Sequence, residues 1–552
     1  SGENTTNNAG NAGGGGGGSA TMPSAQDGGG ANVAPPVVAA PPVPPPVSPP
    51  IAQPYPELTR KPLVGVYYFG VWSPALYDDR TVNLPIPNSI ATLSWWVGVE
   101  DFFMKTGAAY NVWAQRTPNL IDFSDRKPNI GYYDLRDASV VERHIDQASK
   151  GSIDFFNFYW FWSKKNNAPG YADGLKSFRQ ASNKSKMRFA ISIYANNNPD
   201  LNIPDEDIPQ AAAAIADTVA DPAYLRIGGR PVLYVSDGRG IGDGMPATVT
   251  NFITLIQKAL ATNGMPAPLI IGGAGIANGT AAQIVQMPID ALSCLHPRSS
   301  GVIAGDDYDA FVAGIPSYYA GMLSTYGKPV APCAAANIDE RPLQIHNLAA
   351  GPDAFRYYAN FTPYKFYLGL QAVRSWQKTQ TAALSDIVSI YAWNEWWEGG
   401  FLEPNIRDGD LLLNLVQRTF RTVILNKYAG STVAMGHRVT TQPLSAPWTL
   451  EWTWKVFNEQ DTKQSRTPLY ECRDTSDRYF VSTRADCEGS AALGMLGFLA
   501  AGQYDVQGLV PLYRCSLPSG DHFVSGNADC DASSAPAFNI HTDGLLGYVF
   551  PY

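Results

Sequence analysis

Two glutamates lie three residues apart in an aromatic segment, residues 391–404, which reads YAWNEWWEGGFLEP. Glu395 and Glu398 could together cleave a glycosidic bond, because that reaction needs one carboxyl group to protonate the leaving oxygen and a second to assist attack. Burial against aromatic rings would raise the pKa of a carboxyl group, as a general acid requires. The alternative interpretation is a capped strand end with two ordinary surface glutamates.

The position of these acids depends on the strand that carries them, which we expect at residues 387–395. Successive side chains of a strand point to opposite faces. Tyr391 and Trp393 are therefore expected on the same side as Glu395, where tryptophan rings could pack against the C–H faces of a sugar. We expect Trp397 to pack against the sugar in the same way, and Asn394 to be a further substrate contact.

Eight short runs of apolar, β-branched and aromatic residues recur between residues 63 and 430, with helix-like stretches between them. They cover residues 64–72, 153–162, 188–196, 231–237, 268–275, 291–297, 329–337 and 387–395. Eight alternations of strand and helix predict an α/β fold, a (β/α)8 barrel of the TIM type. An open, doubly wound parallel sheet is the alternative.

The stretch 137–150 illustrates the helices between these strands. Asp137 can cap its N-terminus, and four apolar residues fall on one face: Val140, Val141, Ile145 and Ala148. His144 is expected on the surface. The first connection, residues 73–136, is long enough to contribute substrate-binding loops.

The C-terminal ends of the strands line the active site of a barrel. The polar and aromatic residues near these ends are therefore candidate substrate contacts, and core packing is the alternative for each. At strand ends they are Tyr67, Tyr68, Tyr159, Trp160, Tyr194 and Asn196, and in the long first loop they are Trp95 and Trp96. Asp339 and Arg341 could contact sugar hydroxyls or could pair with each other.

The acidic segment resembles a known family of enzymes. The pattern WNEWxEG followed by LEP is similar to the signature of family 99 glycoside hydrolases and of their relatives, the WbsX-like domains of bacterial polysaccharide loci. Further similar blocks precede it in the expected order: GYYDL at 131–135, IDFFNFYW at 153–160, FAISIYAN at 189–196 and PVAP at 329–332, the last followed by Asn337, Asp339 and Arg341. The resemblance covers about residues 63–430.

The resemblance implies a (β/α)8 barrel that cleaves α-linked glycans with retention of configuration. Carried over, Glu395 deprotonates the 2-hydroxyl of the substrate, which attacks the anomeric carbon, and Glu398 is the general acid and later the base. The chain departs from the endomannosidase pattern at Trp397, where those enzymes carry His, so the sugar is left open. A non-catalytic glycan-binding or structural surface protein on the same barrel is the alternative.

Four of the six cysteines belong to a sequence repeat near the C-terminus. PLYEC at 468–472 recurs as PLYRC at 511–515, and FVS at 480–482 recurs at 523–525. The equal spacing predicts two local disulfides, Cys472–Cys487 and Cys515–Cys530, with a four-thiolate zinc site as the alternative. Cys294 and Cys333 could be two buried thiols or could form a disulfide, and the sequence does not decide between these alternatives. We expect residues 468–552 to form a small all-β module, stapled by disulfides, that binds carbohydrate or cell wall or only stabilises the chain.

Composition limits the remaining possibilities. The chain has 552 residues and a net charge of −9, and none of its apolar runs is long enough to span a membrane. An acidic chain of this kind does not predict nucleic-acid binding. The chain contains neither a Walker loop nor an HExxH motif, and its glycines at 273 and 275 lack the third glycine of a dinucleotide fingerprint, so we predict no cofactor. The proposed mechanism uses only carboxylates, so it demands no metal.

The two ends of the predicted barrel complete the organisation. Residues 1–62 are rich in Gly and Pro, which predicts a disordered tail or a tether to a cell surface. Residues 431–467 are expected to form a bridge to the β module. We therefore predict a secreted or surface-tethered protein whose partner is a polysaccharide or oligosaccharide.

Overall fold

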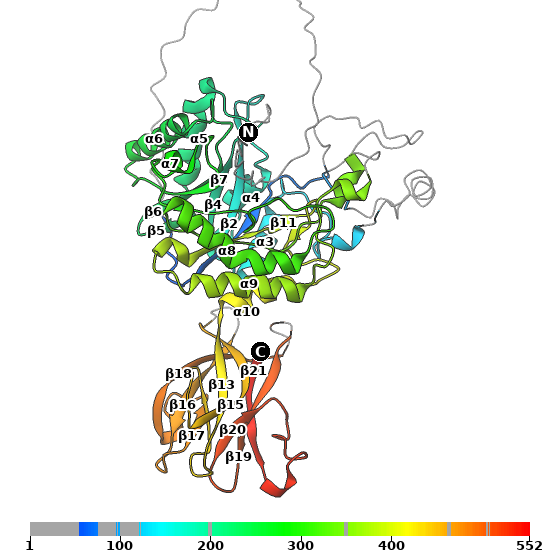
Figure 1. Cartoon of the computed structure of the whole chain (residues 1–552), viewed down its shortest axis with the longest axis vertical. Helices are drawn as coiled ribbons and strands as arrows, with labels where there is room; N and C mark the ends of the chain where they lie inside the picture. Colours follow the sequence, from blue (N-terminus) through cyan, green and yellow to red (C-terminus); the bar gives the residue numbers. More distant parts are fainter. Residues whose placement is uncertain are drawn as a thin grey trace, which may run out of the picture.

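The computed structural model describes residues 54–74, 95–96, 98–99, 121, 123–196, 201–346, 351–460, 465–503, 506 and 508–552. Figure 1 shows two parts, a barrel of strands and helices and an antiparallel β module that ends the chain. Most of the predicted tail, 1–62, lies outside the described residues. Its last residues do not behave as a tail: the Tyr55 amide donates to the Pro222 carbonyl at 2.9 Å, and Arg60 pairs with Asp154.

Eight parallel strands form the barrel wall, one for each predicted run. They are β1 (Leu63–Tyr68), β2 (Phe155–Ser163), β4 (Arg188–Tyr194), β6 (Arg230–Asp237), β7 (Leu269–Gly275), β8 (Ala291–Leu292), β9 (Cys333–Ala335) and β10 (Ile387–Tyr391). Their order is β8-β7-β6-β4-β2-β1-β10-β9. A parallel bridge between Leu292 and Val330 closes the ring next to β9. The barrel is confirmed, and closure excludes the open sheet.

Helices surround this wall (Figure 1). They are α3 (Ala138–Lys150), α4 (Asp173–Gln180), α5 (Ile208–Val219), α6 (Pro246–Thr262), α7 (Ala281–Ile284), α8 (Tyr308–Tyr326), α9 (Pro363–Gln377) and α10 (Leu411–Phe420). Shorter pieces are β3 (Ala168–Gly170), β5 (Arg226–Ile227), η1 (Ser124–Arg126), η2 (Lys184–Lys186), η3 (Asp205–Asp207), η4 (Arg341–His346), η5 (Pro352–Ala354) and η6 (Ala383–Asp386). Within the described residues, the helices include none that is both long and apolar enough to cross a membrane.

Helix α3 follows the sequence prediction closely but corrects one residue. Asp137 caps it by accepting a hydrogen bond from the Ser139 amide, and the four predicted apolar residues are buried. His144, expected on the surface, is fully buried because α3 packs on β1, where the Tyr68 hydroxyl bonds its Nδ1 at 2.7 Å.

The C-terminal module contains three copies of a three-stranded unit. They are β13 (Thr422–Gly430), β14 (His437–Thr440) and β15 (Trp448–Phe457); β16 (Arg466–Arg473), β17 (Tyr479–Ser482) and β18 (Ala491–Ala500); and β19 (Val510–Ser516), β20 (His522–Ser525) and β21 (His541–Pro551). In each unit the first strand pairs with the other two. The long strands β15, β18 and β21 pair with one another and join the units.

The first unit differs from the sequence expectation. Residues 422–430 were assigned to the barrel and 431–467 to a bridge, yet they form β13, β14 and β15. The first unit lacks the PLY-C pattern that revealed the other two. Its relation to them lies in the core, where Leu425, Leu469 and Leu512 are all fully buried at the matching position of each first strand.

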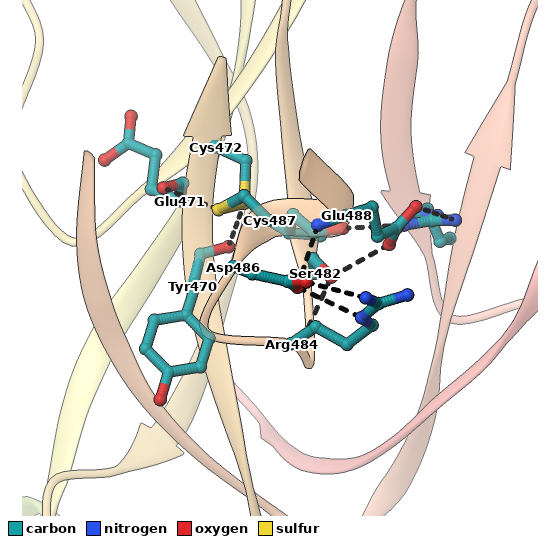
Figure 2. Close-up of a disulfide and its surroundings, with 10 residues drawn as sticks. Tyr470, Glu471, Cys472, Ser482, Arg484, Asp486, Cys487 and Glu488 are labelled. Atoms are coloured by element: carbon teal, nitrogen blue, oxygen red, sulfur yellow. Dashed lines mark hydrogen bonds and ion pairs between the residues drawn. A yellow bond between two sulfur atoms is a disulfide. The ribbon is translucent and has the colours of Figure 1, made fainter. Parts of the chain in front are cut away.

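Three disulfides connect the six cysteines. Cys472–Cys487 and Cys515–Cys530 form the two predicted local bridges, so the zinc alternative is excluded. Figure 2 shows the first of them, which connects β16 to the turn η7 (Cys487–Gly489). Beside it the Ser482 hydroxyl donates to the Glu488 carboxylate, and the Glu488 amide donates to the Asp486 carboxylate. The third unit has its own short turn, η8 (Pro536–Phe538). Cys294 and Cys333, left open by the sequence, also form a disulfide, next to β8 and β9. Such bridges persist in oxidising compartments.

Candidate active site

Strand β10 ends at Tyr391, and the two glutamates follow in a small hairpin. Its strands are β11 (Asn394–Glu395) and β12 (Gly400–Phe401), with Glu395 opposite Gly400. Glu398 lies in the turn between them, and its amide donates to the Glu395 carbonyl at 3.2 Å. Both acids are therefore held at the C-terminal mouth of the barrel by one short hairpin.

The two glycines after Glu398 are required by close contacts. Gly399 has a φ of 77°, and a Cβ there would lie 2.8 Å from the Asp339 amide nitrogen. A Cβ on Gly400 would lie 2.2 Å from the ring of Tyr391. Only glycine accepts the first backbone conformation without strain, and only glycine leaves room for the tyrosine that contacts Glu398.

A buried ion pair fixes this turn from outside. Arg126 Nη2 lies 2.6 Å from Asp339 Oδ2, and Arg126 Nη1 donates to the Trp396 carbonyl at 3.1 Å. The Asp339 amide donates to the Glu398 carbonyl at 2.7 Å. Asp339 also binds Arg341, whose Nε lies 2.7 Å from Asp339 Oδ1. Asp339 and Arg341 thus pair with each other, the structural alternative stated from the sequence.

Asn394 connects the hairpin to β1. Its side-chain oxygen accepts from the Phe69 amide at 2.8 Å, and its side-chain nitrogen donates to the Phe69 carbonyl at 3.0 Å. The Trp72 indole donates to the Asn394 carbonyl at 2.8 Å. Asn394 is fully buried and uses its amide on the backbone, so it positions the hairpin rather than offering a contact to substrate.

Glu398 is a partly buried carboxyl group whose pKa is raised to about 7. Burial is the largest cause and the charge of Glu340 adds to it, whereas Arg356 and a hydrogen bond from Tyr391 oppose the rise. The Tyr391 hydroxyl donates to Glu398 Oε2. A carboxyl group in this environment can carry a proton near neutral pH.

Glu395 is more deeply buried, with 7% of its surface exposed. Burial raises its pKa well above the ordinary value, and repulsion by Glu398 and Glu340 adds to the rise, while a hydrogen bond with Tyr159 opposes it. The repulsion between Glu395 and Glu398 places the two carboxyl groups within electrostatic reach of each other. One proton shared by the pair is the state that such repulsion favours.

A small, open pocket with a volume of about 100 Å³ lies at this end of the barrel. Its walls come from the ends of β4, β6, β7 and β10 and from the segments after β8 and β9. Glu398 and Tyr391 line it, whereas Glu395 does not. Arg239, Arg298 and Arg356 also line it.

The predicted tyrosines of the barrel interior come together beside the two acids. The Tyr67 ring stacks on Tyr159 at 5.6 Å, and Tyr159 meets Tyr194 edge to face at 5.2 Å. Tyr194 lines the pocket. Burial and the charges of Glu395 and Glu398 keep the pKa of Tyr159 high, so its hydroxyl stays protonated and can donate.

Four other predicted contacts are fully buried away from the pocket. Tyr68 and Trp160 lie on the faces of β1 and β2 opposite to Tyr67 and Tyr159, where the helices cover them. Trp393 packs against His144 and Phe156, because the strand ends at Tyr391 and alternation no longer applies beyond it. Trp96 is also buried; its indole donates to the Tyr133 carbonyl at 2.9 Å.

The aromatic surface that remains accessible differs from the predicted one. Trp397 is almost buried and stacks on the partly exposed Trp95 at 5.4 Å. Trp95 meets Phe69 and Tyr171, and Phe69 meets Tyr159. Phe69 and Tyr171 were missed, although Phe69 directly follows the predicted tyrosines of β1. Asn196 is partly exposed just after β4, next to residues outside the described part.

Sequence reasoning also missed the charged groups around Glu398. Glu340 is buried and pairs with the partly exposed Arg356, whose Nε donates to Glu340 Oε2 at 2.8 Å. Glu340 stands between the two residues that were singled out, Asp339 and Arg341, so its position carried a signal. The arginines of the pocket lie between secondary-structure elements, at positions without a sequence motif.

Comparisons with known proteins give one family and several distant structures. Residues 202–416 match a family model described as "Glycosyltransferase WbsX", which confirms the WbsX-like resemblance of the sequence. No curated protein matches the chain.

The similar solved structures include a glycoside hydrolase-like protein, with 16% identity and a TM-score of 0.43 over 67% of this chain and 96% of that chain. A GH99 endo-alpha-mannosidase from Bacteroides thetaiotaomicron has 14% identity and a TM-score of 0.41 over 65% and 96%. An exo-beta-1,4-mannosidase from Opitutaceae bacterium strain TAV5 has 14% identity and a TM-score of 0.35 over 66% and 60%.

Proposed function

We propose that this chain is an extracellular glycoside hydrolase that cleaves an α-linked glycan with Glu395 and Glu398. The observation that carries the proposal is the pair itself: two electrostatically coupled carboxyl groups with raised pKa at the C-terminal mouth of a closed barrel, one of them lining a pocket. In barrel enzymes, catalytic groups come from this face.

In the proposed mechanism Glu395 accepts the proton of the sugar 2-hydroxyl. That oxygen attacks the anomeric carbon and the glycosidic bond breaks, while Glu398 gives its proton to the leaving oxygen. Glu398 then accepts a proton from water, whose oxygen attacks the anomeric carbon and opens the resulting anhydro sugar with retained configuration, while Glu395 returns its proton to the 2-oxygen. The family resemblance suggests these roles, and a pKa of about 7 lets Glu398 carry a proton near neutral pH. Burial raises the pKa of Glu395 as well, so the mechanism requires Glu395 to be the ionised member of the pair when the sugar is bound.

The surroundings of the pair support a sugar as the ligand. Phe69, Trp95 and Tyr171 are partly exposed aromatic residues near Tyr159, the tyrosine that lowers the pKa of Glu395. Aromatic rings and a few convergent polar groups are usual in ligand sites. The three disulfides support the extracellular location.

Glycosyl transfer is the second candidate function, because the family model that matches residues 202–416 is named for a glycosyltransferase. The same pair of acids could pass a sugar to a hydroxyl group of an acceptor instead of to water. The two functions differ in the product: hydrolysis leaves a new reducing end, and transfer leaves a longer glycan.

The test is to incubate the full chain with a panel of α-linked bacterial and fungal polysaccharides and to identify products by mass. We expect at least one polysaccharide to yield shorter fragments, and the Glu398→Gln variant to yield none. Glu206→Gln, which changes an exposed glutamate, is the matched control. Fragments from Glu398→Gln at the wild-type rate, or none from the wild type with any polysaccharide, would contradict the proposal.

A further inference from the structure

Three arginines reach the pocket that Glu398 lines. Arg239 follows β6, Arg298 follows β8, and Arg356 precedes α9. They come from separate segments of the chain, so the barrel fold brings their guanidinium groups to one cavity. The proposed hydrolytic mechanism uses none of them.

Each guanidinium group is held in place by a carboxylate. Arg239 Nε and Nη2 donate to Asp237 at 3.0 and 2.7 Å. Arg356 Nε and Nη2 donate to Glu340. Arg298 Nη1 lies 2.6 Å from Asp306 Oδ2, and its Nε donates to Ser300 at 3.1 Å. These contacts fix the orientation of all three side chains.

One terminal nitrogen of each arginine is left over. Nη1 of Arg239, Nη1 of Arg356 and Nη2 of Arg298 make no hydrogen bond with any described residue. The pocket therefore offers three oriented N–H donor groups. Its own carboxylates are Asp237 and Glu398, and the pKa of Glu398, about 7, leaves that group partly protonated at neutral pH.

The pocket lining also includes His296, whose protonation state depends on the surrounding charges. His296 stacks on Phe311 at 4.4 Å, and its Nε2 is hydrogen-bonded with the Tyr358 hydroxyl at 3.2 Å. Its pKa is lowered to about 3: burial is the largest cause, the charges of Arg298 and Arg356 add to the lowering, and the charge of Asp306 opposes it. His296 is thus neutral and adds no positive charge.

We infer that this pocket binds an acidic group of the glycan, a carboxylate or a sulfate ester, through the three arginines. Guanidinium groups form charge-assisted, often forked hydrogen bonds with oxyanions, and such bonds are about twice as strong as neutral ones. A neutral sugar presents hydroxyl groups that need acceptors as well as donors, whereas the three arginine nitrogens supply donors alone. The inference deepens the proposed function, on which the identification of the ligand as a glycan rests.

Ligand-observed NMR titration of the full chain tests the inference with matched pairs of small glycosides. The pairs are methyl α-glucuronoside, α-galacturonoside and α-mannuronoside, each against its neutral hexoside, with the 6-sulfates of the same hexosides as a second arm. We expect at least one acidic member to bind about tenfold more tightly than its neutral partner. A preference confined to the uronosides or to the sulfates distinguishes the two acidic groups.

Variants assign the preference to the pocket. Arg298→Gln and Arg239→Gln should each reduce the binding of the acidic glycoside by about tenfold, while Arg484→Gln, on an exposed arginine of the β module, should leave it unchanged. Circular dichroism and the melting temperature confirm that each variant is folded, and Arg298→Lys keeps the charge as a second variant.

Equal binding of acidic and neutral members in all pairs, or undiminished binding by both folded Gln variants, overturns the inference. Because binding needs no turnover, its failure is separate from that of the proposed function. Hydrolysis of neutral glycans with no acidic preference overturns only the inference. Acidic binding without any hydrolysis overturns only the proposed function.

Discussion

At the scale of single residues, the proposed chemistry depends on two carboxyl groups that burial and mutual repulsion keep from ionising together. Glu395 is the more buried of the two, whereas Glu398 lines the pocket. The charge of Glu340 raises the pKa of Glu398 and the charge of Arg356 lowers it. The Tyr391 hydroxyl donates to Glu398, and Tyr159 lowers the pKa of Glu395. These contacts give the two acids different surroundings, as different roles require.

The assigned roles predict different responses to the leaving group. With a 2,4-dinitrophenyl glycoside of the released sugar, the leaving oxygen needs no proton. Glu398→Gln should therefore lose about a hundredfold or more on the natural glycan but retain most of its first-step rate on the aryl glycoside. Glu395→Gln should lose activity on both. Stopped-flow release of dinitrophenolate measures this step, and an equal loss by Glu398→Gln on both substrates would refute its role as acid.

The pKa of Glu398 predicts the pH dependence of cleavage. A general acid must be protonated, so kcat/KM should fall as the pH rises through about 7. Arg356 lowers this pKa, so Arg356→Gln should move the falling limb to higher pH, whatever it does to the absolute rate. Initial rates between pH 5 and 9, measured for both proteins, check this point. If the falling limb stays at the same pH in Arg356→Gln, the limb does not report the titration of Glu398, and this prediction is contradicted.

Sequence patterns located the two acids but not the aromatic surface around them. Glu395 and Glu398 were singled out because their residue type and spacing suit the proposed chemistry, and the structure places both in one hairpin at the barrel mouth. Trp393 was misplaced because strand alternation was extended past Tyr391, where the strand ends. Arg239, Arg298 and Arg356 were not found, since only the closed barrel brings these separate segments together.

At the scale of elements, the β module depends on contacts between its units. His437 of β14 in the first unit lies 2.6 Å from Asp521, next to β20 in the third, and 3.4 Å from Glu451 of β15. Burial alone would lower the pKa of His437, but the hydrogen bonds and charges of Asp521 and Glu451 outweigh it and raise the pKa to about 9. The protonated histidine thus joins two units.

This pair predicts a pH-dependent contribution to stability. The folded pKa is above the unfolded value of about 6.5, so the contribution is complete below that pH and is lost as the pH rises through about 9. The melting temperature of His437→Gln should therefore fall below wild type most at pH 6 and least at pH 10. Calorimetry of the full chain measures it, with His541→Gln, on an exposed histidine, as control. A deficit independent of pH would contradict this prediction.

Elements were predictable where local patterns are strong. The eight strands and the capped helix α3 follow from apolar periodicity and an N-cap residue. The unit formed by β13, β14 and β15 was not recognised because it shares buried positions with the other two but not their cysteines or their PLY pattern. A core position such as Leu425 can be compared with Leu469 only when the strand register is known.

At the scale of the whole molecule, one buried charge network connects the barrel to the module. Asp154, whose side chain is fully buried before β2, binds Arg421, at the junction of α10 and β13, and accepts from the Val64 amide at 2.7 Å. Arg60 also binds Asp154, and its Nη1 lies 2.9 Å from Glu459, just after β15. β1, β2 and the first unit of the module thus meet at one carboxylate.

Removing this carboxylate should destabilise the whole chain. Asp154→Ala removes the fully buried carboxylate beside Arg421 and leaves only Glu459, at 3.7 Å, near that buried charge. Breaking such a buried pair costs about 3–5 kcal/mol. Asp217→Ala, at an exposed ion pair, should cost less than about 1 kcal/mol. Urea unfolding followed by tryptophan fluorescence compares the two variants. A loss for Asp154→Ala as small as that for Asp217→Ala would mean that the network does not hold the two parts together.

The most direct test of the central claim is proton NMR of the cleavage reaction as it proceeds. With a polysaccharide that the wild type degrades, the account predicts that the α-anomer of the new reducing end appears first and then mutarotates. Neither Glu395→Gln nor Glu398→Gln should produce a new anomeric signal. First appearance of the β-anomer, or wild-type turnover by either folded variant, would contradict the claim that this pair of carboxyl groups cleaves the bond with retention.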